Sequence, residues 1–120
     1  METITPSELI RLRDDVQRAY DVLIREVFGS ITVRQRQRLD EIAVAMEKIS
    51  RAIDEYSNWI DMPEILRTTD PRYRLMYAAR TPMEMILQCA YFLHINHMRK
   101  QEVLNNEQIE AVWLMERSGR

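Results

Sequence analysis

The sequence has few of the residues that interrupt helices. Glycine occurs twice and proline four times in 120 residues, roughly half of their average share in globular proteins. So few turn-forming residues exclude a β-sandwich. Gly29 and Gly119 both fall at expected helix ends, so the chain lacks the glycine-rich loop that lets a backbone approach the phosphates of ATP.

Cysteine is also scarce. Cys89 is the single cysteine, which excludes an intrachain disulfide and, without an accompanying catalytic pattern, indicates a small packed side chain. No apolar run approaches the roughly 20 residues of a membrane span, and the first residues lack the pattern of a signal peptide. We therefore expect a cytoplasmic protein with no membrane partner.

The charges are nearly balanced. The 17 Lys and Arg and 19 Asp and Glu leave a formal net charge of −2, which disfavours bulk attraction to nucleic acid. Arg34, Arg36 and Arg38 do not form one basic patch, because alternate residues of a helix lie about 200° apart around its axis. Only Arg34 and Arg38 share a face, so we expect no nucleic-acid partner, although a phosphate contact at the N-terminus of this helix stays open.

The first helix has a clear start. Thr5 can cap it, Pro6 needs no hydrogen-bond donor at the first position, and Glu8 can close a capping box. Apolar residues then recur every three or four positions up to Val27. Gly29 begins the turn that ends the helix.

A second capping box, Thr32 with Gln35, starts a longer helix. Its apolar positions alternate in steps of three and four residues. This spacing is a heptad seam and is typical of a helical bundle or coiled coil. The seam consists of Leu39, Ile42, Met46, Ile49, Ile53, Tyr56 and Ile60.

A third helix follows the linker 61–70, in which Pro63 interrupts the pattern, and Asp70 with Pro71 supplies its start. Pro82 lies inside this helix, which either bends there or restarts with Thr81 as its cap. The segment is expected to close at Leu104 to Asn106, and a short fourth helix to stop at Ser118 and Gly119. The apolar seam of this third helix consists of Met76, Ala79, Met83, Ile86, Ala90, Leu93 and His97.

Together these patterns predict an all-α fold in a single domain over residues 1–120. Hairpin one (5–60) and hairpin two (71–117) form a four-helix bundle, within one chain or as a dimer. The halves share a Thr-Pro start and a similar second cap, at Thr32 and Asn105, which suggests duplication. The expected core or interface residues are Leu39, Ile42, Met46, Ile49, Ile53, Met83, Ile86, Ala90 and Leu93.

The run Arg80-Thr81-Pro82-Met83 resembles the core of the first helix in the dimerisation and phosphoacceptor domain of bacterial sensor histidine kinases. The segments 104–108 and 31–36 resemble the start of that family's second helix. This resemblance implies paired helical hairpins, self-association, and a kinase or receiver domain as a protein partner.

The phosphoacceptor of that family is missing. The family places its histidine three residues before the arginine of the motif, where this chain has Tyr77. A phenol, with an ordinary pKa of about 10, does not replace imidazole as a neutral nitrogen nucleophile. The acidic neighbour is replaced by Ala78. The resemblance therefore implies a non-catalytic signalling or assembly module, with no catalytic residue, cofactor or metal, whose family-like motif is Tyr77, Arg80, Thr81 and Pro82.

Two alternatives stay open. His94 and His97 lie three residues apart, so they share a helix face and could bind a metal or accept phosphate from a separate catalytic domain, in a truncated kinase segment. The simpler interpretation is a pair of helix-end histidines, because no Glu-x-x-His pattern accompanies them. An unrelated helical adaptor is the other alternative.

The aromatic residues either anchor an interface or close the core. They include Trp59, Trp113, Tyr56, Tyr77, Tyr91 and Phe92.

Overall fold

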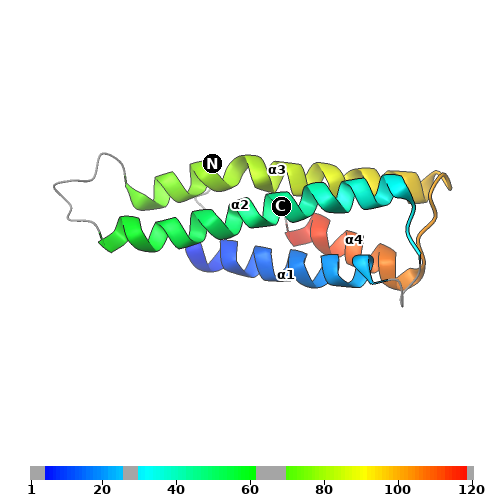
Figure 1. The fold of residues 1–120 in the computed structure, drawn as a ribbon, viewed down its shortest axis with the longest axis horizontal. Helices are drawn as coiled ribbons and strands as arrows, with labels where there is room; N and C mark the ends of the chain where they lie inside the picture. Colours follow the sequence, from blue (N-terminus) through cyan, green and yellow to red (C-terminus); the bar gives the residue numbers. More distant parts are fainter. Residues whose placement is uncertain (1–4, 26–29, 62–69, 119–120) are drawn as a thin grey trace.

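The chain folds into four helices, as a computed structural model shows (Figure 1). The structure describes residues 5–25, 30–61 and 70–118. The helices are α1 (Pro6–Ile24), α2 (Val33–Asp61), α3 (Pro71–Met98) and α4 (Asn106–Ser118). Within those ranges all regular structure is helical, which confirms the predicted all-α fold.

The four helices of one chain close a ring. α2 packs along α3, α1 packs against α2 and α4, and α3 packs against α4. With 29 and 28 residues, α2 and α3 are much longer than α1 and α4, with 19 and 13. The molecule is therefore elongated, 56 × 27 × 20 Å. At the end where the chain leaves α2 and enters α3, these two helices extend beyond α1 and α4 (Figure 1).

The first two helix starts are capping boxes, as predicted. At α1 the backbone N–H of Glu8 donates to Thr5 Oγ1 (3.1 Å) and the backbone N–H of Thr5 donates to Glu8 Oε2 (3.3 Å). At α2 the N–H of Gln35 donates to Thr32 Oγ1 (3.1 Å) and that of Thr32 donates to Gln35 Oε1 (2.8 Å). Each box satisfies two backbone donors that the helix itself leaves without a partner.

The start of α4 repeats the start of α2. Asn105 Oδ1 accepts from the N–H of Gln108 (2.9 Å), and Gln108 Oε1 accepts from the N–H of Asn105 (3.0 Å). Both glutamines are buried, and Gln35 also donates from Nε2 to the carbonyl of Glu102 (3.3 Å). The sequence similarity between segments 31–35 and 104–108 therefore corresponds to two equivalent helix starts, each with a buried glutamine.

Pro82 does not interrupt α3. The helix begins at Pro71, after Asp70 Oδ1 accepts from the N–H of Arg72 (2.8 Å), and continues to Met98. The alternative in which Thr81 caps a restarted helix is therefore wrong. Pro82 removes one backbone hydrogen bond, but its ring is buried in the bundle, and this burial offsets part of the loss.

Two helices end earlier than predicted. α1 stops at Ile24 and Arg25 is extended, whereas Val27 and Gly29 lie outside the described residues. α3 stops at Met98 instead of continuing to Leu104. The reason is local, because the backbone turns at Lys100, whose φ is 58°. This left-handed conformation is incompatible with a continuing right-handed helix.

The predicted linker is described only at its two ends. Asp61 is the last residue of α2 and Asp70 caps α3. Residues 62–69, which include the rest of the predicted linker, lie outside the described part of the chain.

The core forms along the predicted seams. Ile53 and Met83 are partly buried and pack against it. Ile60, expected to continue the seam of α2, is instead 44% exposed, because neither α1 nor α4 reaches that end (Figure 1). Residues predicted for the core that are buried are Leu39, Ile42, Met46, Ile49, Ile86, Ala90 and Leu93.

We expect Ile49→Ala to lower the free energy of unfolding by about 3 kcal/mol, because it leaves a cavity in the core. Val44→Ala is the matched control. Val44 lies on the opposite side of α2 and is 52% exposed, so its truncation should change stability by less than about 0.5 kcal/mol. Urea unfolding followed by circular dichroism measures both. Equal losses in the two variants would contradict the assigned orientation of α2.

Candidate functional site

The family-like motif is split between two sides of α3. Tyr77, Arg80 and Thr81 are exposed, whereas Pro82 is buried. Tyr77, at the position of the missing phosphoacceptor, is 70% exposed. Arg80 Nε donates to Glu84 Oε1 at 3.3 Å, one helical turn further along. The motif therefore contributes to the core through its proline and to the surface through its other three residues.

A stripe of large side chains runs along the solvent side of α3. Tyr77, Glu84, Tyr91 and Met98 follow one another at intervals of seven residues. Tyr77 stacks on Tyr73 with 6.4 Å between ring centroids. We call this stripe the outer face of α3 and define it by Tyr73, Tyr77, Arg80, Glu84, Tyr91 and Met98.

The outer face leaves much apolar surface in water. Tyr73 and Tyr91 are 54% exposed and Met98 is 60% exposed. At 100° per residue, these positions lie opposite the buried Leu75 and Ile86. Single exposed apolar residues are common on proteins, but several on one helix face are typical of an interaction site.

The outer face continues into an aromatic end formed by α2 and α3. The guanidinium of Arg74 lies 4.2 Å from the ring centroid of Trp59, which joins the two helices by a cation–π contact. Trp59, Arg74, Tyr73 and Tyr77 line a surface hollow of about 540 Å³. This end of the α2 and α3 pair extends beyond α1 and α4 (Figure 1), so its aromatic rings stay accessible.

Cys89 makes a structural contact between α3 and α2. Its Sγ–H donates to Glu41 Oε2 at 3.1 Å, and the same oxygen accepts from Arg38 Nη1 at 3.3 Å. Arg38 also lies 4.4 Å from the ring centroid of Phe92. Burial, followed by the hydrogen bond to Glu41 and its negative charge, raises the pKa of the Cys89 thiol to about 12, whereas Arg38 opposes the shift. Cys89 is therefore a neutral thiol near pH 7.

The two histidines have different partners. His94 Nδ1 lies 2.8 Å from Glu116 Oε1, but the angles between the imidazole and the carboxylate are not those of a hydrogen bond. The ring of His94 also meets Trp113 edge to face at 6.2 Å, so this histidine connects α3 to α4. His97 Nδ1 accepts from the backbone N–H of Leu104 at 2.9 Å and fixes the loop after α3.

Neither histidine belongs to a metal-binding group among the described residues. In those ranges, no three His, Cys, Asp or Glu side chains lie together as metal ligands.

Among the described residues, no helix is both long and apolar enough to cross a membrane. Arg34 and Arg38 line a common surface hollow, as their shared face predicts.

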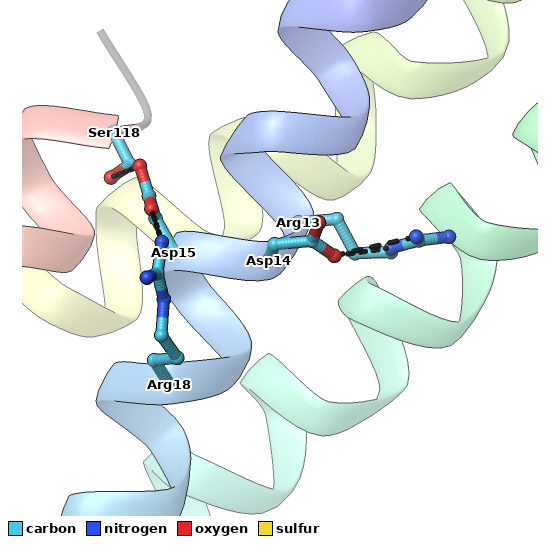
Figure 2. A network of polar contacts seen from close by, with 5 residues as sticks. All are labelled: Arg13, Asp14, Asp15, Arg18 and Ser118. Carbon is cyan, nitrogen blue, oxygen red and sulfur yellow. Dashed lines mark hydrogen bonds and ion pairs between the residues drawn. The ribbon is translucent and has the colours of Figure 1, made fainter.

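The opposite side of the bundle is secured by contacts between α1 and α4. Figure 2 shows Asp15 of α1 between Ser118 of α4 and Arg18. Ser118 Oγ donates to Asp15 Oδ2 at 3.4 Å, and Asp15 Oδ1 pairs with Arg18. Arg13 and Asp14 pair separately, at 3.3 Å. The Ser118–Asp15 contact joins the end of α4 to α1, whereas both ion pairs lie within α1.

Sequence reasoning named Tyr77, Arg80 and Tyr91 of the outer face but did not group them into one surface. The signal was the seven-residue recurrence from Tyr77 to Met98. A second recurrence, from Met76 to Ala90, occupies the same helix. Periodicity assigns this second stripe to the core, and the structure buries Ile86, Ala90 and Leu93 as predicted. Periodicity does not identify the first recurrence as a surface.

We expect the stability of the folded chain to fall above pH 9 because of Cys89. Its pKa rises from 9.0 to about 12 on folding, so the unfolded chain loses the thiol proton first. The Cys89 contribution is fully present below pH 9 and should decrease by about 1.4 kcal/mol between pH 8 and pH 10. Urea unfolding of the wild type and of Cys89→Ala at both pH values isolates it. An identical pH dependence of the unfolding free energy in the two chains would contradict the buried contact of Cys89 with Glu41.

Comparison with known proteins gives no relative for this chain. No protein-family model, no curated protein and no solved structure matches it.

Proposed function

We propose that this chain is a non-catalytic assembly module of a signalling system and that it associates with a second copy of itself through the outer face of α3. The observation that carries this proposal is the exposure of Tyr73, Tyr77 and Tyr91 on one side of one helix. Tyrosine is enriched at the energetic centres of interfaces, because its ring offers a large contact area and its hydroxyl stays compatible with water.

The resemblance to histidine-kinase dimerisation domains supports the same surface. Arg80 and Thr81 belong to the resembling motif and are exposed on α3. A residue that receives phosphate from another domain has to be accessible, and Tyr77 occupies that position with 70% of its surface exposed. The chain thus has a binding side chain where that family has a reactive one. A kinase or receiver domain is the further partner that this proposal implies.

The competing hypothesis assigns phosphate acceptance to His94 or His97. His94 lies between Glu116 and Trp113, and His97 holds the backbone of Leu104. Phosphorylation of either ring would disturb contacts that connect α3 to α4 or to the loop before α4. We therefore assign structural roles to both histidines and place the function at the outer face.

We expect the wild type to be a dimer at micromolar concentration, and Tyr77→Asp and Tyr91→Asp to weaken association at least about tenfold. Each substitution puts a charge into both halves of a symmetric interface. Light scattering coupled to size exclusion over a dilution series measures the mass. Val103→Asp is the control, because Val103 is 65% exposed but lies in the loop before α4.

Circular dichroism checks that each variant keeps the helicity of the wild type. A monomeric wild type at every concentration would disprove self-association. Equal weakening by Val103→Asp would assign the interface to another surface.

A further inference from the structure

The outer face of α3 is arranged symmetrically about its middle. Arg80 and Glu84 flank residue 82, two positions on either side. Tyr73 lies seven residues before Arg80, and Tyr91 lies seven residues after Glu84. Read from either end, these four residues therefore present a tyrosine, a charged residue, a charged residue of opposite sign and a second tyrosine, whereas Tyr77 and Met98 have no counterpart of their own kind.

Such an arrangement is complementary to itself when two copies run in opposite directions. Each helix rises 1.5 Å per residue, so antiparallel helices keep the sum of the facing residue numbers constant. With residue 82 at the two-fold axis, Arg80 faces Glu84 of the second copy, and Tyr73 faces Tyr91 of the second copy. A two-fold axis forms each of these contacts twice.

We propose that α3 pairs with α3 of a second copy in this antiparallel register, centred on residue 82. The inference rests on the proposed function and specifies its partner and geometry. Arg80 and Glu84 already bond to each other within one copy at 3.3 Å. Because a guanidinium has five N–H donors, Arg80 can keep this bond and also donate to Glu84 of the second copy.

The register explains features of the outer face that a parallel pair does not. A parallel pair in register would place Arg80 against Arg80 and Glu84 against Glu84, which are repulsive contacts. In the antiparallel register the four charges alternate in sign. Met98 lies beyond the paired segment 73–91.

Charge reversal tests the register. Arg80→Glu and Glu84→Arg, each alone, should raise the dissociation constant about tenfold, because each turns both attractive contacts into repulsive ones. An equimolar mixture of the two variants should restore association, since each copy then faces opposite charges. Analytical ultracentrifugation at fixed salt measures the three samples, and a higher salt concentration should reduce the differences.

Arg51→Glu is the matched control. Arg51 and Glu47 form a similar pair one turn apart on α2, with 2.6 Å between Arg51 Nη2 and Glu47 Oε1. Arg51→Glu therefore creates the same repulsion within α2 and leaves the contact between the two α3 helices unchanged. This variant should associate like the wild type.

Crosslinking reports the direction of the helices. In a Cys89→Ala background, a mixture of Tyr73→Cys and Tyr91→Cys chains should form a mixed disulfide dimer on oxidation, and each variant alone should not. Crosslinking of each variant with itself would indicate a parallel pair and overturn the register.

The outcomes separate the two proposals. A wild type that dimerises with a dissociation constant unaffected by Arg80→Glu would overturn the register and leave self-association through α3 intact. Loss of association in the single variants without recovery in the mixture would overturn the register as well. A monomeric wild type would overturn both.

Discussion

Burial of the apolar seam between α2 and α3 is the interaction on which the rest of this bundle depends. These are the two longest helices, and Ile42, Ile49 and Ile86 are completely buried in their shared core. α1 and α4 add their own apolar faces to this pair and close the ring. Because they are shorter, they leave one end of the pair uncovered (Figure 1). The outer face of α3 is uncovered for another reason, because it lies opposite the stripe of α3 that packs into the core.

Polar contacts secure the starts of α2 and α4 and the loop after α3. Thr32 with Gln35 and Asn105 with Gln108 start α2 and α4 in the same way, and His97 holds the loop between α3 and α4. Residue types that serve catalysis in other proteins are used structurally here. The Cys89 thiol bridges α3 to Glu41 of α2, and its raised pKa keeps it in the neutral form.

α3 serves two surfaces at once. One stripe, which includes Leu75 and Ile86, lies in the core, and the stripe on the opposite side carries Tyr77 and Tyr91 into water. Both stripes recur about every seven residues because 3.5 residues make one turn of a helix that packs along another. The motif that resembles histidine kinases lies across this division, with Pro82 in the core and Arg80 outside. A helix of this kind can be stable within one chain and still offer a complete face to a second.

The sequence by itself determined the number of helices, their starts and the residues of the buried seams. These features are local, because a capping box needs residues only three positions apart and a seam needs only a period. The tertiary structure decided that α1 stops at Ile24, that α3 continues through Pro82, and that Ile60 is exposed. The exposure of Ile60 depends on how far the neighbouring helices reach (Figure 1), and the burial of Pro82 depends on packing against them. Both are properties of contacts between residues distant in the chain.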